Sequence, residues 1–166
     1  MIGSWNLEVG GFMKKKRFIE DYLGFAREAG ELFDLNPVVI LAQSALETGW
    51  GQSTLCREYH NYFGISGYGK ANEFWRGRTV QLSPSSSLLF RCYDEPLLSF
   101  LDYGRLIRGK YKMAADMSFY PEAFAKEIAY SAYISEVNGD NREAYQRGLV
   151  RICRMIGEKM EISSRA

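Results

Sequence analysis

The stretch Pro37-Val-Val-Ile-Leu-Ala-Gln-Ser-Ala-Leu-Glu-Thr-Gly-Trp-Gly-Gln52 places one acidic residue where an apolar helix gives way to glycine. Asn36 can cap this helix, and Pro37 suits its first turn. Apolar residues recur at helical spacing and predict one buried stripe: Val38, Leu41, Ala42, Ala45 and Leu46. Because successive helical residues are rotated by about 100°, Glu47 lies roughly opposite this stripe, in the last turn. The pattern predicts a carboxyl group that faces away from the packed side, beside Trp50.

Two interpretations of Glu47 follow from this position. In a cleft beside an aromatic ring, a carboxyl group is shielded from water, which favours its protonated form and suits a general acid. On the outer face of a helix, a glutamate is simply solvated, as most glutamates are. The sequence elements that accompany Glu47 favour the first interpretation.

Several later elements accompany this stretch in a specific order and spacing. They are Ala42-Gln-Ser-Ala-Leu-Glu-Thr-Gly-Trp-Gly-Gln-Ser53, Asn61-Tyr-Phe-Gly-Ile65, Trp75-Arg-Gly77, Phe90-Arg-Cys-Tyr93 and Ser99-Phe-Leu-Asp-Tyr103. Together they resemble the endo-β-N-acetylglucosaminidases of glycoside hydrolase family 73, which cleave the sugar strands of bacterial peptidoglycan. The resemblance covers roughly residues 15 to 157. It implies a lysozyme-like fold and a general-acid role for Glu47.

The composition is that of an ordinary folded domain. The chain has 166 residues, of which 46% are hydrophobic and 25% charged, and its net charge of +1 argues against nucleic-acid binding. No apolar run reaches the roughly 20 residues needed to cross a bilayer, and the N-terminus lacks the pattern of a signal peptide. With three cysteines, one histidine and no phosphate-binding loop, the sequence predicts neither a disulfide framework nor a metal or other cofactor.

Helical patterns occupy both ends of the chain, and a different pattern lies between them. Residues 1–13 are expected to form a flexible N-terminal tail and residues 14–166 a single domain, which opens with a helix over residues 14–34. Glycines and short apolar segments between residues 61 and 93 indicate a small hairpin lobe. The last helix has its own buried stripe: Tyr145, Leu149, Ile152, Ile156 and Met160. The predicted fold is α+β and mostly helical, a lysozyme-like domain with a β-hairpin lobe beside the active cleft.

Glycoside hydrolysis usually needs a second group that stabilises or attacks the cationic transition state. Family members commonly carry a second acidic residue in the hairpin, yet the interval from Arg78 to Leu89 contains neither Asp nor Glu. Glu73, just before Trp75, either folds back towards the cleft or is a solvated turn residue. The other source of stabilisation is the acetamide group of the substrate, whose carbonyl oxygen can attack the adjacent anomeric carbon.

The resemblance also implies a set of substrate-binding residues. Tyr133 follows a helix where family members place a tyrosine opposite the catalytic glutamate, although the family's downstream Thr-Asp-Pro is absent here. Asn61 and Phe63 match the family's Asn-x-Phe-Gly, which shapes the floor of the cleft. Trp50 and Trp75 are either stacking platforms for sugar rings or anchors of the lobes. Core packing is the alternative for Tyr133 and Phe63.

The sequence therefore predicts a peptidoglycan hydrolase that cuts the β-1,4 bond after N-acetylglucosamine, with Glu47 as general acid. A muramidase or lytic transglycosylase that uses the same glutamate is the alternative within this class. An inactive glycan-binding or structural module is the alternative of another class, and the acid-free hairpin motivates it. The expected partner is the glycan strand of the cell wall. We expect synthesis in the cytoplasm and action in the periplasm or outside the cell, after delivery by secretion machinery or a phage lysis partner.

Overall fold

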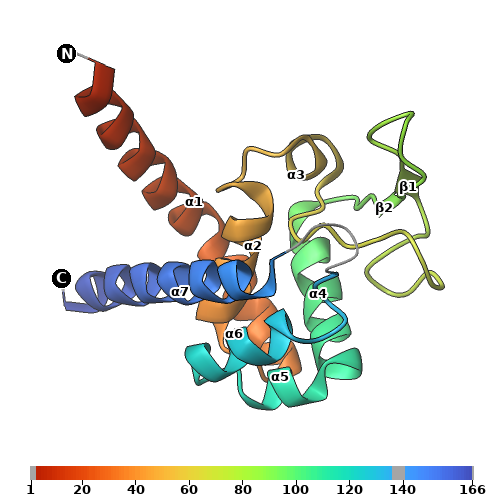
Figure 1. The fold of residues 1–166 in the computed structure, drawn as a ribbon. Coiled ribbons are helices and arrows are strands. Elements are labelled where there is room, and N and C mark those ends of the chain that lie inside the picture. Colours follow the sequence, from red (N-terminus) through yellow and green to blue (C-terminus); the bar gives the residue numbers. More distant parts are fainter. Residues whose placement is uncertain (1–2, 136–140, 166) are drawn as a thin grey trace.

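The computed structural model describes residues 3–135 and 141–165 of the chain, with side-chain surroundings given for residues 10–135 and 141–161. Figure 1 shows a body of helices with a hairpin lobe at its side. The elements in chain order are α1 (Gly3–Phe33), α2 (Pro37–Thr48), α3 (Thr54–Tyr59), β1 (Thr79–Val80), β2 (Phe90–Arg91), α4 (Pro96–Lys110), α5 (Lys112–Asp116), α6 (Pro121–Ala129) and α7 (Arg142–Arg165). This arrangement confirms the α+β, mostly helical fold class.

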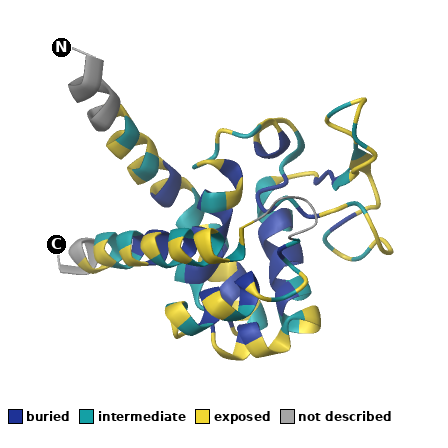
Figure 2. Ribbon diagram, viewed as in Figure 1, coloured by how far each residue is buried: buried dark blue, intermediate teal, exposed yellow. Residues whose placement is uncertain are grey.

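Helix α2 is the most enclosed element of the helical body, since both α1 and α7 pack against it. Its burial extends around the helix instead of following one stripe (Figure 2), and the buried residues are Val39, Ile40, Leu41, Ala42, Gln43, Ser44, Ala45 and Thr48. The predicted stripe was therefore too narrow, because neighbouring helices cover more than one face of α2. Glu47, in the last turn, remains exposed.

Both ends of α2 are fixed by residues that the sequence indicated. The Asn36 side chain accepts a hydrogen bond of 3.0 Å from a first-turn backbone N–H, and Pro37 begins the helix. At the other end, Gly49 adopts a left-handed conformation with a φ of 57°, and its N–H bonds back into the last turn. Glycine adopts this conformation without the steric cost of a Cβ atom, so the helix ends close behind Glu47.

Helix α1 starts at Gly3, whereas the sequence predicted that the first helix begins at residue 14. Helix extension adds one hydrogen bond per residue once a helix exists, and the segment between these two positions contains no proline to stop it. Figure 1 shows this part of α1 extending away from the other helices. Within the described part of the chain, no helix is sufficiently long and apolar to cross a membrane.

The hairpin lobe is small, as predicted. Strands β1 and β2 are antiparallel and pair Thr79 with Arg91 and Val80 with Phe90. An isolated bridge joins Ser66 to Phe90, which ties the segment before the hairpin to the same sheet. Because β2 leads directly into α4, the lobe is covalently and spatially fixed to the helical body.

We expect the Asn36→Ala substitution to lower the free energy of unfolding by about 1 kcal/mol, because it removes the side-chain acceptor at the N-terminus of α2. Urea denaturation followed by circular dichroism measures this difference. Asn36→Asp is the matched control, since it keeps an acceptor oxygen at the same place and should retain most of the stability. Equal losses in both variants would contradict the capping role.

Candidate active site

A cleft of about 1160 Å³ lies between the helical body and the lobe, and Glu47 is part of its lining. Five parts of the chain form its walls. They are the end of α2, the lobe segment of residues 63–66 and 68–72, Arg91 of β2, the end of α4 with Tyr111, and residues 132–134 together with Tyr145 of α7. The predicted acidic residue therefore does face a cleft instead of a flat, solvated surface.

A chain of hydrogen bonds connects Glu47 to the core. The Tyr145 hydroxyl donates to Glu47 Oε1 over 3.2 Å, and the Gln43 Nε2 group donates to the Tyr145 oxygen over 3.0 Å. The Tyr103 hydroxyl in turn donates to Gln43 Oε1. Gln43 and Tyr103 are completely buried. Three helices, α2, α4 and α7, thus contribute to the surroundings of one carboxyl group.

The buried end of this series of hydrogen bonds, at Tyr103, determines which group donates and which accepts in each bond. Burial raises the pKa of Tyr103 well above its usual value, so its hydroxyl keeps its proton and acts as a donor. Since that proton occupies the amide oxygen of Gln43, the amide nitrogen faces Tyr145. The Tyr145 oxygen accepts this bond, which directs its own proton to Glu47. Tyr145 is therefore an oriented donor that holds the carboxyl group in place.

Sequence reasoning missed this role of Tyr145. The residue lies 98 positions after Glu47, and its spacing fits the apolar stripe of the last helix. The hydroxyl group of Tyr145 could have indicated this role in the sequence. A tyrosine at the start of such a stripe can pack with its ring while its polar hydroxyl reaches a cleft.

Phe63 lines the cleft beside Glu47, and Asn61, which is outside the lining, holds the turn that carries Phe63. The buried Asn61 side chain donates to the carbonyls of Ile65 and Arg91, both at 3.0 Å, and its oxygen accepts backbone N–H groups of the same turn. Phe63 is 2% exposed, and its ring stacks on Tyr103 at 4.1 Å. Both side chains therefore pack and hydrogen-bond within the protein, and the turn that they fix carries the cleft-lining residues Phe63 and Gly64.

Gly64 is where this turn comes closest to the acidic residue. Its φ is +63°, and a Cβ atom added there would lie 3.5 Å from Glu47 Oε2. The left-handed backbone favours glycine, and the absence of a side chain leaves room above the carboxyl group. The turn that Asn61 holds together therefore keeps the chain close to Glu47 without covering it.

Tyr133 also lines the cleft. Its hydroxyl lies 3.5 Å from the Phe63 carbonyl oxygen, to which it donates, and its ring meets Tyr111 edge to face at 5.6 Å. Burial raises the pKa of Tyr133 well above its usual value, and the charge of Glu47 adds to this effect. Its hydroxyl therefore remains a neutral donor near Glu47.

Glu73, Trp50 and Trp75, like Asn61, are not among the residues that line the cleft. Glu73 is exposed outside it. Trp50 packs edge to face on Phe18 at 5.7 Å, which attaches the end of α2 to α1. Trp75 is 2% exposed and donates its indole N–H to the Arg78 carbonyl over 2.8 Å. Both tryptophans therefore have the geometry of anchors that attach parts of the protein to each other, and not of stacking platforms for sugar rings.

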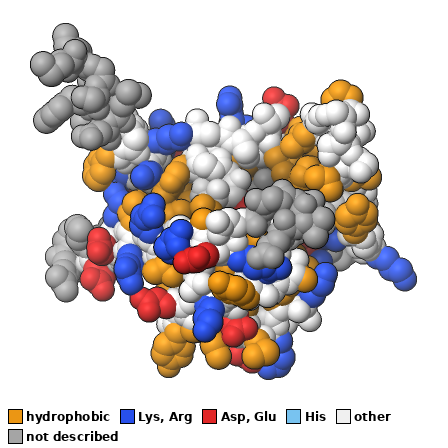
Figure 3. All heavy atoms as spheres, in the orientation of Figure 1, with side chains coloured by type: hydrophobic (Ala, Val, Ile, Leu, Met, Phe, Trp, Pro, Cys, Tyr) orange, Lys and Arg blue, Asp and Glu red, His pale blue; other side chains and the backbone are white. Residues whose placement is uncertain are grey.

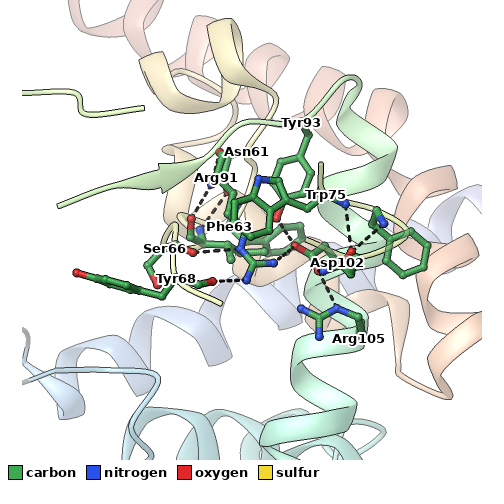
Figure 4. Close-up of polar contacts among 12 residues, drawn as sticks. Asn61, Phe63, Ser66, Tyr68, Trp75, Arg91, Tyr93, Asp102 and Arg105 are labelled. Atoms are coloured by element: carbon green, nitrogen blue, oxygen red, sulfur yellow. Dashed lines mark hydrogen bonds and ion pairs between the residues drawn. The ribbon is translucent and has the colours of Figure 1, made fainter. Parts of the chain in front are cut away.

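A buried cluster around Asp102 fixes the lobe wall of the cleft (Figure 4). Arg91 Nη1 lies 2.8 Å from Asp102 Oδ2, and the remaining guanidinium nitrogens donate to the carbonyls of Ser66 (3.1 Å) and Tyr68 (2.6 Å). Asn72 donates to Asp102 over 3.1 Å. The cluster thus holds the cleft-lining segment at both of its ends, with the Trp75 ring packed 3.9 Å from the Arg91 guanidinium.

Comparison with known proteins supplies the family context of this cleft. Residues 24–158 match the family model described as mannosyl-glycoprotein endo-beta-N-acetylglucosaminidase. The peptidoglycan hydrolase FlgJ of Pseudomonas aeruginosa is 29% identical over 160 residues, which cover 87% of this chain and 38% of that protein. A probable N-acetylmuramidase of Lactococcus lactis is 32% identical over 131 residues, covering 74% of this chain and 28% of that protein. The chain thus spans less than half the length of these relatives.

Solved structures resemble the fold over nearly its whole length. The glycoside hydrolase domain of FlgJ from Salmonella typhimurium superposes with a TM-score of 0.68 at 27% identity, covering 91% of this chain and 93% of that one. The catalytic domain of the autolysin Auto from Listeria monocytogenes gives a TM-score of 0.66 at 21% identity, over 87% of this chain and 85% of that one. The lysozyme-like fold is thereby confirmed.

We expect Arg91→Met to lower the free energy of unfolding by about 3 kcal/mol, because it leaves the buried Asp102 carboxylate without its main cationic partner. Arg76→Ala is the matched control. Arg76 forms an ion pair of similar length, 2.8 Å, with Asp94, but its side chain is 80% exposed, so its loss should cost less than about 1 kcal/mol. Urea denaturation of both variants measures the contrast. Similar losses in the two variants would show that the Asp102 cluster does not stabilise the lobe.

Proposed function

We propose, since the chain belongs to the glucosaminidase family, that it is a peptidoglycan hydrolase that cleaves the β-1,4 bond after N-acetylglucosamine. The observation that carries the proposal is the position of Glu47, which lines a cleft and is held there by an oriented hydroxyl group. A positioned carboxyl group can protonate the leaving oxygen of a glycosidic bond. Relatives named as peptidoglycan hydrolases support the choice of substrate.

We propose that the acetamide of the substrate supplies the second catalytic function. Among the described residues that line the cleft, Glu47 is the one acidic residue, and Glu73 lies outside the lining. In this scheme the acetamide oxygen attacks the anomeric carbon while the glycosidic C–O bond breaks and Glu47 gives its proton to the leaving oxygen. Water then attacks the same carbon, returns its proton to Glu47 and restores the acetamide. We propose that Tyr133, which lines the cleft, binds a polar group of the sugar.

The same geometry is compatible with cleavage at the neighbouring bond. The 32% identity to a probable N-acetylmuramidase favours this second candidate, in which Glu47 keeps its role and the product ends in N-acetylmuramic acid or its anhydro form. In either case the substrate is the glycan of the cell wall. We propose that the chain acts in the periplasm or outside the cell, after delivery by secretion machinery or a phage lysis partner.

Digestion of purified peptidoglycan tests the proposal, with the new reducing ends identified by mass spectrometry. We expect ends in N-acetylglucosamine from the wild type, and about 10²- to 10⁴-fold less product from Glu47→Gln, because the amide cannot donate the proton. The Glu73→Gln variant separates the two sources of cation stabilisation. The variant stays active if the acetamide stabilises the cation, and it loses activity if Glu73 does. Ends in N-acetylmuramic acid would move the reaction to the other bond. A wild type that releases no products from several wall types would indicate an inactive glycan-binding or structural module.

The dependence of activity on pH tests the role of Tyr145. A general acid must be protonated, and the Tyr145 hydroxyl supports the ionised form of Glu47 by donating to it. We therefore expect Tyr145→Phe to move the alkaline limb of the kcat/KM profile to higher pH. The control is Tyr120→Phe, which removes a hydroxyl from a tyrosine that is 72% exposed and outside the cleft. A loss of activity without movement of the limb would mean that Tyr145 only packs.

A further inference from the structure

The cleft contains far more positive than negative charge. Its lining includes Lys70, Arg91, Arg105 and Lys110, whereas Glu47 is the one acidic residue among the described residues there. The chain as a whole carries a net charge of only +1, and on the face seen in Figure 3 basic and acidic side chains are interspersed. The positive charge of the cleft is therefore a local feature and needs its own explanation.

The Asp102 cluster contributes to this charge. Asp102 carries one negative charge between two guanidinium groups, since Arg105 Nε also lies 2.9 Å from its Oδ1. Arg91 is buried, and its nitrogens donate to protein oxygens. Arg105 is different, because its side chain is 38% exposed and its terminal nitrogens point away from Asp102 (Figure 4). The cluster therefore leaves one net positive charge at the wall, and Arg105 carries it to the cleft.

Two lysines extend the positive wall. Lys70 belongs to the lobe segment that Arg91 and Asp102 hold at both ends, so its backbone has a fixed place. Lys110 ends α4, with its ammonium group 5.8 Å from the ring centre of Tyr111. Both side chains are exposed, and the ion pairs found among the described residues include neither of them. Their charge is available to a ligand in the cleft.

We propose that Lys70, Arg105 and Lys110 form a subsite for the acidic peptide stem of peptidoglycan. This inference rests on the proposed function, because a bound glycan strand brings its stems to the cleft by covalent attachment. The sugars of the strand are largely neutral, whereas the stem carries free carboxylates, which pair well with guanidinium and ammonium groups. The subsite gives the enzyme a preference for strands that still carry their peptides.

Binding to matched glycan strands tests the subsite. The protein is the Glu47→Gln variant, so that the strands survive, and calorimetry measures the dissociation constant. Three soluble preparations are compared: strands with stems, strands stripped of stems by an N-acetylmuramoyl-L-alanine amidase and then treated so that the exposed lactyl carboxylates are methylamides, and strands whose stem carboxylates have been converted to methylamides. We expect the first to bind most tightly, with an advantage that shrinks as salt screens the charges.

The Lys70→Ala/Lys110→Ala double variant should weaken binding of stem-bearing strands about three- to tenfold, and should reduce the preference over stripped and amidated strands. Lys126→Ala is the control, since it removes an exposed lysine of α6 that lies outside the cleft. An equal loss on all three preparations, or an equal loss in the control, would overturn the subsite. A glycerol-phosphate polymer of the cell wall is tested as a competitor. If it competes as strongly as stem-bearing strands do, the positively charged side of the cleft binds phosphate instead of peptide stems.

Hydrolysis by the wild-type chain is measured on the same preparations and provides a separate readout. Absence of products from every preparation would overturn the proposed function. Products formed at equal kcat/KM from stem-bearing and stripped strands would leave the hydrolase standing and overturn only the stem subsite. Faster turnover of stem-bearing strands, lost in the double variant, would support both.

Discussion

The amide of Gln43 is completely buried in α2, so its oxygen and its nitrogen both need partners within the protein. Tyr103 of α4 satisfies the oxygen and Tyr145 of α7 accepts from the nitrogen. One buried polar group thereby fixes the relative positions of three helices. It also decides which way the Tyr145 hydroxyl points, and so where the Glu47 carboxyl group is held. The geometry around Glu47 follows from the need to satisfy the hydrogen bonds of a single side chain in the core.

The lobe also depends on one buried polar group that needs partners within the protein, the carboxylate of Asp102. A buried carboxylate is costly unless it is paired and hydrogen-bonded, and here Arg91, Arg105, Tyr93 and Asn72 all contribute. Because Arg91 also binds carbonyl oxygens of the lobe, the same pairing that satisfies the charge gives the cleft its second wall. In both the helical body and the lobe, the contacts that satisfy a buried polar group therefore also position a wall of the cleft.

The parts that could be predicted from the sequence are those with local causes. The cap at Asn36, the glycine at position 49 and the helical periodicity between them were sufficient to place Glu47 at an exposed helix end. The parts that could not be predicted depend on contacts distant in the chain. Burial around α2 requires its neighbours, and the bond from Tyr145 spans 98 positions. The helical start at Gly3 was missed because glycines indicated a tail, whereas an established helix continues unless something stops it.

The bond between Tyr145 and Glu47 has a consequence for the order of events during folding. Helix α7 follows all the other described elements along the chain, so on a ribosome it emerges after them. Until it docks, Gln43 lacks one partner and the carboxyl group lacks its oriented donor. A chain in which α7 has not yet docked therefore holds Glu47 without the Tyr145 donor. Assembly of the site around Glu47 is therefore coupled to a long-range step of folding, the docking of α7 against α2.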